Sequence, residues 1–181
     1  MSAEPCRTFV IGLGANLGER GATLKSAVLA LQAEGTITAV SHLYESAAVG
    51  PAQPDFLNAA VSLETSLAPG RLLACLLVVE RQHGRERRER WGPRTLDLDL
   101  LYSPDLLLRE PDLTLPHPEL TRRAFALAPL LDVAPDAREP GSRRRYADLL
   151  SALGEQGLRR LETSDEWDPR PNRSAAPGRA E

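Results

Sequence analysis

The stretch Arg81–Ser103, with the sequence RQHGRERRERWGPRTLDLDLLYS, carries the signals that decide both the fold and the site. Its first part, residues 81–94, holds six arginines against two glutamates, although the whole chain has a formal net charge of −3. Its second part alternates leucine with aspartate, which is typical of a strand with one buried face. Because residues i and i+2 of a strand point to the same side, we predict that Asp97 and Asp99 share one face and the leucines the other.

The two halves of this stretch suit the same kind of ligand. Two carboxylates on one face repel each other unless a cation lies between them, and magnesium favours one or two carboxylates together with substrate phosphates. Arginine forks match phosphate oxygens in bidentate fashion. Arg85 and Arg94 lie nearest the anchored ends of the basic loop, so we predict that these two reach the site, and that Arg87 and Arg88 are solvated. The stretch therefore predicts a site for a polyphosphate and its metal ions.

Outward from this stretch, hydrophobic periodicity predicts strands at 8–14, 36–44, 56–65 and 96–102, and helices at 19–33 and 67–83. The order βαββαβ predicts an α+β, ferredoxin-like fold, in which one antiparallel sheet carries helices on one face. C-terminal additions follow: a short hairpin at 105–115, a helical stretch interrupted by Pro129, and a late helix at 146–153. We expect a single domain at 1–161 and a disordered, polar, proline-rich tail at 162–181.

Composition excludes several classes of protein. The chain has 181 residues, of which 42% are apolar, so it is long enough for one domain with a sizeable core. Cys6 and Cys75 have no metal-ligand spacing, which predicts reduced thiols. We find no signal-peptide pattern and no apolar run near the ~20 residues that cross a membrane, so we expect a cytoplasmic protein. The net charge of −3 argues against general nucleic-acid binding.

Two further motifs each have an ordinary and a functional interpretation. Gly12, Gly14 and Gly18 resemble a dinucleotide fingerprint between a strand and a helix, but the chain lacks the repeated βα units of such a domain. We therefore interpret these glycines as a tight turn. His117 lies between two prolines in a stiff, extended segment, where it is either a mounted hydrogen-bond donor or a surface histidine.

Phe56 and Asn58 form a third candidate on the strand at 56–65. They are two residues apart, so a ring and an amide share one face. Such a pair could stack on a flat heterocycle and bond its edge, or it could be a core phenylalanine beside an incidental asparagine. A buried asparagine needs hydrogen-bond partners, which favours the functional interpretation.

Four segments together resemble a known family: GLGANLG at 12–18, YESAAVGPAQPDFLNAAVSLET at 44–65, GRERRERWGPRTLDLDLLY at 84–102 and LPHPELTRRAFALAPL at 115–130. The family is 6-hydroxymethyl-7,8-dihydropterin pyrophosphokinase, and the resemblance spans about Phe9 to Ala134. It implies a ferredoxin-like fold, two magnesium ions, and transfer of diphosphate from ATP to the pterin with release of AMP, in folate biosynthesis. The chain has Ser46-Ala47-Ala48 where the family often has Thr-Pro-Pro.

The resemblance also implies roles for individual residues. Asp97 and Asp99 would bind both metal ions, and Arg85 and Arg94 would neutralise phosphate charge. ATP would be held by three residues: His117, Arg123 and Thr114. The pterin would be bound by six residues: Ser46, Val49, Phe56, Asn58, Trp91 and Phe125. ATP and the pterin are thus the expected partners of a monomer that binds neither nucleic acid nor membrane.

Two alternatives remain open at this point. Another two-metal nucleotidyl or phosphoryl transferase on a ferredoxin-like core would present a similar aspartate pair, but it would not need Phe56, Asn58 and Phe125 arranged for a pterin. An RNA-binding module would explain a ferredoxin-like sheet with a basic loop. That module calls for exposed aromatic residues on the sheet, and the acidic pair opposes it.

Overall fold

The computed structural model describes residues 5–50, 52–85, 92–104, 106–154, 156–161 and 167. An antiparallel sheet with the strand order β5-β1-β4-β3-β8 forms its centre, and β2 also pairs with β4. The bounds of these strands are β1 (Arg7–Ala15), β2 (Thr36–Val40), β3 (Tyr44–Ser46), β4 (Phe56–Thr65), β5 (Asp97–Tyr102) and β8 (Arg159–Arg160). The predicted hairpin is present as a separate pair, β6 (Leu108–Arg109) and β7 (Thr114–Leu115).

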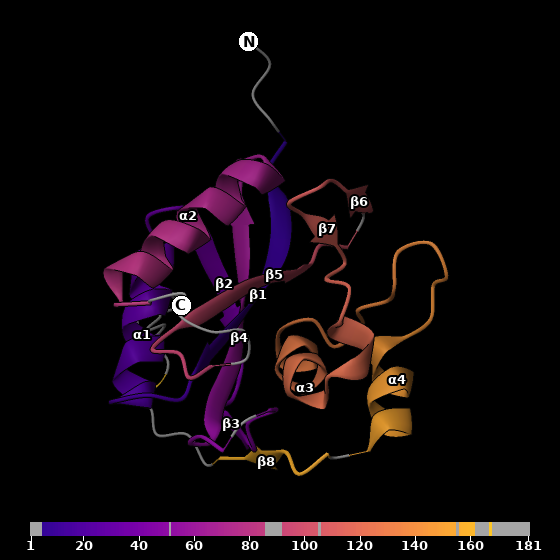
Figure 1. Ribbon diagram of the computed structural model, residues 1–181. Coiled ribbons are helices and arrows are strands. Elements are labelled where there is room, and N and C mark those ends of the chain that lie inside the picture. The colour runs from indigo at the N-terminus through magenta and orange to yellow at the C-terminus, as the bar shows by residue number, and fades with distance from the viewer. Residues whose placement is uncertain are drawn as a thin grey trace, which may run out of the picture.

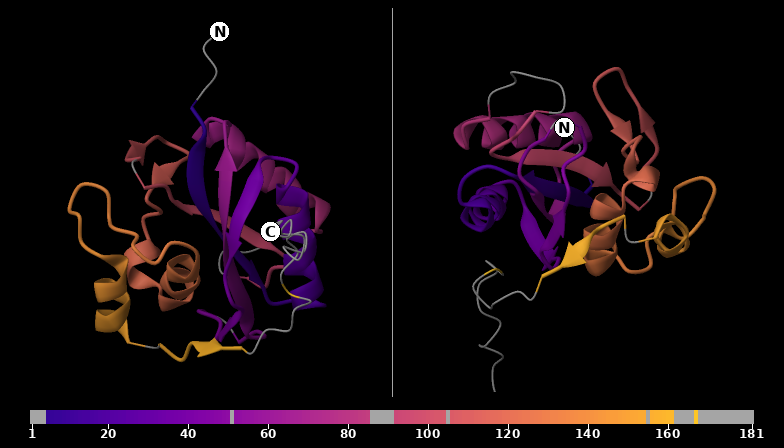
Figure 2. Two further views of the ribbon diagram at one scale, coloured as in Figure 1. Left: turned by 180° about the vertical axis from the view of Figure 1, so that it is seen from behind. Right: turned by 60° about the horizontal axis from the view of Figure 1, so that its bottom comes forward.

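Helices lie on both sides of the sheet (Figures 1 and 2). One side carries α1 (Arg20–Leu31) and α2 (Pro69–Gln82), which are the two helices of the βαββαβ order. The other side carries a short 3-10 helix, η1 (Leu120–Arg122), with α3 (Ala124–Val133) and α4 (Tyr146–Leu153). The α+β, ferredoxin-like prediction is confirmed, and the C-terminal additions cover part of the second face.

Alternation along β1 divides the buried residues into two cores. Phe9, Ile11 and Leu13 point toward α1 and α2 and join a large apolar cluster with leucines of both helices. Val10 points to the opposite face and packs in a second cluster with residues of α3 and α4, including the fully buried Tyr146. The second cluster covers only one end of its face, and the other end is left for a site.

The predicted strand at 36–44 is wrong in one respect, because it is two strands. β2 ends at Val40 and β3 begins at Tyr44, and both pair with β4. Between them, the Ser41 hydroxyl accepts a hydrogen bond from the Ala60 main-chain nitrogen at 2.8 Å. A side chain thus takes the place of a main-chain acceptor at Ser41, where the strand is broken.

Two C-terminal expectations also need comment. The α3 helix continues through Pro129, which the sequence predicted as an interruption; proline removes one intrahelical donor without ending the helix here. The predicted disordered tail lies outside the described residues except at Trp167. That residue is buried rather than solvated, because its ring joins the larger core and its indole nitrogen donates to the Ser41 carbonyl at 2.7 Å.

No helix in the described ranges is long and apolar enough to span a membrane.

Candidate active site

The floor of the site is the C-terminal half of β1, which lies between β5 and β4. Gly12 pairs with Asp99 of β5, and Gly14 pairs with Asp97 of β5 and Asn58 of β4. Because glycine has no side chain, the space above β1 stays open between the two aspartates and Asn58. A cavity of about 850 Å³ lies over this floor, which is a typical size for a small-molecule site.

The strand predicted at 8–14 is confirmed and contains Gly12 and Gly14, so the interpretation of the glycine motif as a tight turn does not extend to these two residues. It holds for Gly18, whose φ of +62° lies in the left-handed region that favours glycine. A Cβ atom at Gly12 would come within 2.9 Å of the Leu101 side chain. The absence of a side chain at Gly12 therefore leaves room for Leu101, which also lines the cavity.

Ten of the residues predicted for the site line this cavity: Ser46, Val49, Phe56, Asn58, Arg94, Asp97, Asp99, His117, Arg123 and Phe125. Thr114 lies in β7 and is not among the lining residues. Trp91 and residues 86–90 of the basic loop, which include Arg87 and Arg88, lie outside the described residues. The structure therefore brings together the β5 aspartates, the β4 pair and the segment around His117, which are far apart in the sequence.

The β5 side of the cavity is built from charges. Arg94 contacts Asp97 at 2.6 Å, and Arg85 contacts the other oxygen of the same carboxylate at 2.8 Å. Arg85 does not line the cavity itself, so it acts on the site through Asp97. Both arginines singled out from the sequence therefore converge on one aspartate.

Glu80, which was not predicted from the sequence, supports this arrangement. Its side chain is 2% exposed at the end of α2, where it forms an ion pair with Arg85. Its carboxylate also accepts a hydrogen bond from the Leu98 main-chain nitrogen of β5 at 2.8 Å. Burial raises the pKa of Glu80, and the Leu98 and Arg85 contacts oppose that shift. Its position four residues after Leu76, on the apolar face of α2, is the signal that identifies it.

The donor set on β5 fits a divalent cation that phosphate ligands complete. Burial raises the pKa of Asp99, and the neighbouring Asp97 charge raises it further. A cation between the two carboxylates would relieve both costs. Within the described ranges there is no group of three or more potential metal-binding side chains. Two carboxylates alone suit magnesium, which usually takes its remaining ligands from water and phosphate.

The opposite side of the cavity is built from neutral groups. Asn58 is 5% exposed, and its amide nitrogen donates to the Ser46 hydroxyl at 2.9 Å and to the Tyr44 carbonyl at 3.4 Å. Phe56 lines the cavity from the same face of β4, and Phe125 lines it from the first turn of α3. An amide held in place beside two aromatic rings suits a flat heterocycle with polar edges.

Polar contacts attach the Phe125 helix to the sheet. Asp132 of α3 accepts hydrogen bonds from the His42 main-chain nitrogen and from the Tyr44 hydroxyl, both at 3.0 Å. Burial and the Asp132 charge raise the pKa of Tyr44 to about 12, so its hydroxyl stays a donor at neutral pH. The helix that carries Phe125 is thereby attached to β3, which carries Ser46.

His117 and Arg123 occupy the third wall of the cavity. The Glu119 main-chain nitrogen donates to the Nδ1 atom of His117 at 3.2 Å, so the ring proton of the neutral histidine lies on Nε2. The Arg123 guanidinium lies 5.7 Å from the centre of the Phe125 ring, within cation–π range. Both residues present hydrogen-bond donors, as binding to phosphate or ribose requires.

Several lining residues could not be found from the sequence: Glu119, Arg122, Gln156 and Leu158. Gln156 follows α4, and its side-chain oxygen accepts a hydrogen bond from the Ala124 main-chain nitrogen at 3.2 Å, at the start of α3. Gln156 and Leu158 reach the cavity because the chain after α4 returns to pair with β3. No local pattern signals that return.

Comparison with known proteins agrees with this geometry. Residues 10–135 match the family 7,8-dihydro-6-hydroxymethylpterin-pyrophosphokinase (HPPK). The 2-amino-4-hydroxy-6-hydroxymethyldihydropteridine pyrophosphokinase of Synechocystis sp. is 44% identical over 152 residues, which cover 83% of this chain and 78% of the relative. The protein of the same name from Pseudomonas aeruginosa is 45% identical over 154 residues, which cover 83% of this chain and 94% of the relative.

Solved structures agree at the level of the fold. A crystal structure of Plasmodium falciparum HPPK-DHPS with pteroate matches 88% of this chain with a TM-score of 0.66 and 15% identity. This chain spans 47% of that solved chain, or about half of its length. Since the family match covers most of the chain and both relatives carry the same activity, the chain belongs to the HPPK family, whose reaction is a pyrophosphate transfer in folate biosynthesis.

Proposed function

We propose that this cavity binds ATP together with 6-hydroxymethyl-7,8-dihydropterin, and that it transfers the terminal diphosphate of ATP to the hydroxymethyl group with release of AMP. The observation that carries the proposal is the division of the cavity wall. Arg94, Asp97 and Asp99 form a charged side along β5, and Asn58, Phe56 and Phe125 form a neutral side. A charged side suits a polyphosphate, and a neutral aromatic side suits a pterin.

The chemistry asks for positioning more than for covalent catalysis. The pterin hydroxyl oxygen attacks the β-phosphorus, and a new oxygen–phosphorus bond forms as the hydroxyl loses its proton. The bond from the β-phosphorus to the bridging oxygen of the α-phosphate breaks, and AMP leaves with that oxygen and the electron pair. Transfers of this type depend mainly on alignment and charge stabilisation, so we assign no protein nucleophile.

Asp97 and Asp99 would hold the two magnesium ions that accompany the triphosphate. When bound, magnesium neutralises phosphate charge and stabilises the charge that develops on the attacking and leaving oxygens. Arg94 lines the cavity beside Asp97. A guanidinium group carries five N–H donors, so its pairing with Asp97 leaves donors for phosphate oxygens. Arg85, which is held by Glu80, would keep the Asp97 carboxylate oriented.

The remaining residues would hold the two substrates in place. His117, with its proton on Nε2, and Arg123 would donate to ATP. Phe56 and Phe125 would stack on the pterin ring, and Asn58 would accept a hydrogen bond at the ring edge, since its amide nitrogen already donates to Ser46 and Tyr44. The roles assigned to Thr114, Val49 and Trp91, the cytoplasmic location and the monomeric state stay predictions.

A product assay tests the proposal. The purified chain is incubated with ATP, magnesium and 6-hydroxymethyl-7,8-dihydropterin, and the nucleotides and pterins are separated by chromatography. We expect equal amounts of AMP and pterin diphosphate, with no AMP when the pterin is left out. Release of ADP, or no turnover with the pterin present, would contradict the proposal.

A further inference from the structure

Asn16 lies between the two sides of the site without lining the cavity. It follows β1 directly and is only 2% exposed. The sequence predicts a turn around this residue, and in a turn an asparagine side chain usually bonds its own local main chain. Here each of its side-chain bonds reaches a segment far away in the sequence.

Toward the charged side, Asn16 holds the main chain of Arg94 by two hydrogen bonds. The Arg94 main-chain nitrogen donates to the Asn16 side-chain oxygen at 2.7 Å. The Asn16 main-chain nitrogen donates to the Arg94 carbonyl at 3.1 Å. This pair of bonds fixes the backbone of Arg94, whose guanidinium contacts Asp97.

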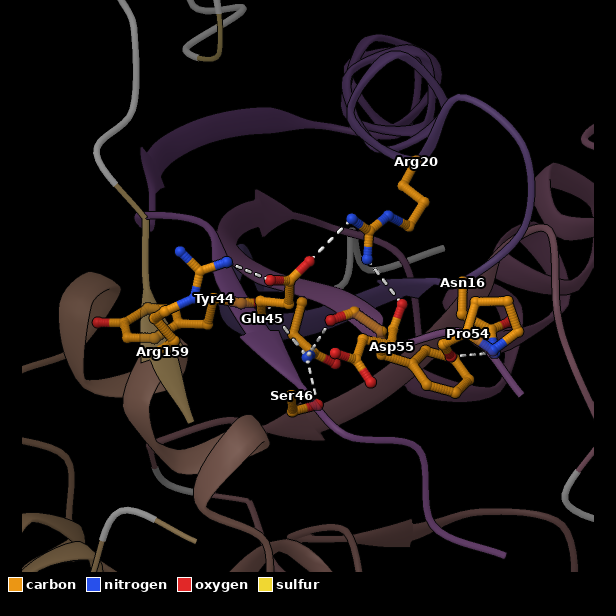
Figure 3. A network of polar contacts seen from close by, with 10 residues as sticks. Asn16, Arg20, Tyr44, Glu45, Ser46, Pro54, Asp55 and Arg159 are labelled. Atoms are coloured by element: carbon orange, nitrogen blue, oxygen red, sulfur yellow. Dashed lines mark hydrogen bonds and ion pairs between the residues drawn. The ribbon is translucent and has the colours of Figure 1, made fainter. Parts of the chain in front are cut away.

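Toward the neutral side, the Asn16 amide nitrogen holds the segment that leads into β4. It donates to the Gln53 side-chain oxygen at 2.9 Å and to the Pro54 carbonyl at 3.0 Å. Phe56, which lines the cavity, follows Pro54 by two residues. Figure 3 shows the hydrogen bond from Asn16 to Pro54, just before β4 begins at Phe56.

Arg20, on the first turn of α1, holds the same segment but has a different second partner. Its guanidinium donates to the Asp55 carbonyl at 2.7 Å and contacts the Glu45 carboxylate of β3 at 2.8 Å (Figure 3). Arg20 therefore fixes both ends of the loop between β3 and β4, and it forms neither a hydrogen bond nor an ion pair with Arg94. Asn16 and Arg20 thus provide a matched pair: one bridges the two sides of the site, and the other holds one side.

We propose that Asn16 is a positioning residue that couples the phosphate side of the site to the pterin side, an inference that rests on the proposed function. The side-chain oxygen of Asn16 bonds the phosphate side, and the side-chain nitrogen bonds the pterin side. An ordered Arg94 main chain therefore orients the Asn16 amide so that its nitrogen reaches Gln53 and Pro54. Binding of the nucleotide beside Arg94 then favours the pterin-binding arrangement of the loop before β4. Because such coupling is reciprocal, pterin also tightens the binding of nucleotide.

Calorimetric titrations test this coupling in the full chain. The pterin is titrated with and without saturating magnesium and an ATP analogue that has a methylene group between the α- and β-phosphorus atoms. The readout is the ratio of the two pterin dissociation constants. For the wild type we expect the analogue to tighten pterin binding by about fivefold or more, the usual lower range for coupled sites. A wild-type ratio of one overturns the inference.

Asn16→Asp removes the donor of the side-chain amide and keeps its acceptor, at nearly constant side-chain volume. The carboxylate still accepts from the Arg94 nitrogen, but it cannot donate to the Pro54 carbonyl. We expect the ratio to fall close to one, with kcat at saturating substrates within about threefold of the wild type. Asn16→Ala should also lose the ratio and should lower kcat, because the Arg94 nitrogen loses its acceptor.

Arg20→Ala is the matched control. It should weaken pterin binding in both titrations by a similar factor and leave the ratio unchanged, since Arg20 acts on one side only. The coupling role is overturned if Asn16→Asp keeps the wild-type ratio of pterin dissociation constants. It is also overturned if this ratio falls toward one in Arg20→Ala as much as in Asn16→Asp. If the wild type neither binds the pterin nor releases AMP, the proposed function fails instead, so the two failures are distinguishable.

Discussion

The two sides of the cavity are built by different means. The β5 side consists of charged groups that hold one another: Glu80 contacts Arg85, and Asp97 contacts both Arg85 and Arg94. The β3–β4 side consists of neutral groups held by hydrogen bonds, such as the bond from Asn58 to Ser46. The first side can hold phosphate charge and metal, and the second can recognise the shape and edge of a ring. Variants on the first side should therefore slow the chemical step, and variants on the second should weaken pterin binding.

The largest effect is expected at Asp97. Asp97→Asn removes one carboxylate of the metal pair and the partner of two arginines. We expect kcat to fall about a thousandfold, equivalent to roughly 4 kcal/mol of transition-state stabilisation. Steady-state kinetics measure the change, with Asp112→Asn, an exposed residue beside the hairpin, as the control. A folded Asp97→Asn variant within tenfold of the wild-type kcat would remove the metal role.

Arg94→Ala should have the next largest effect. The variant removes the guanidinium group that lines the cavity, so we expect kcat/KM for ATP to fall about a hundredfold, or roughly 3 kcal/mol. At saturating ATP the KM for the pterin should change much less, because the variant keeps the Arg94 main chain that Asn16 holds. Arg109→Ala, on the exposed edge of β6, is the control. An equal rise in the KM of both substrates would contradict the division of the site.

Asn58→Ala should show the opposite pattern on the neutral side. Loss of a buried amide that also holds Ser46 costs about 2 kcal/mol, or roughly thirtyfold, in pterin binding. The KM for ATP should stay near the wild-type value. Ser62→Ala, a buried position on the same face of β4, controls for general loosening of the strand. The division would not hold if Asn58→Ala lowered kcat more than it raised the pterin KM.

The smallest effect is expected at Glu45 of β3, and it concerns the free energy of unfolding. Hydrogen bonds from Arg159 and Arg20 lower the pKa of Glu45 below its ordinary value. A lowered pKa stabilises the fold above the ordinary value, and this contribution is lost as the pH falls through the lowered one. Glu45→Gln should therefore lower the free energy of unfolding by up to about 1 kcal/mol at pH 7. Urea unfolding at decreasing pH should show this difference shrinking in acid, and a constant difference would contradict the assignment.

The sequence predicted the charged side better than the neutral side. Alternation in β5 placed Asp97 and Asp99 on one face, because two carboxylates between buried leucines have only one orientation that keeps the leucines in the core. The predicted bounds of β4 and α4 are also confirmed. Phe56 and Asn58 could be placed on one face, but only the family resemblance connected them with Phe125.

What the sequence missed depends on distant contacts. The sequence placed Gly12 and Gly14 in a strand, but it did not show that β1 pairs with β5 on one side and with β4 on the other, which brings Asp97, Asp99 and Asn58 together. Gln156 reaches the cavity because the chain returns after α4, and Trp167 is buried because its indole meets the Ser41 carbonyl. Such positions are set by the completed fold rather than by local periodicity.

One measurement tests the division of the site most directly: a crystal structure of this chain with manganese, the methylene analogue of ATP and the pterin. We expect anomalous manganese density beside Asp97 and Asp99, the triphosphate against Arg94, and the pterin between Phe56 and Phe125 with its edge at Asn58. Manganese away from the two aspartates, or a pterin ring bound on the β5 side, would contradict it.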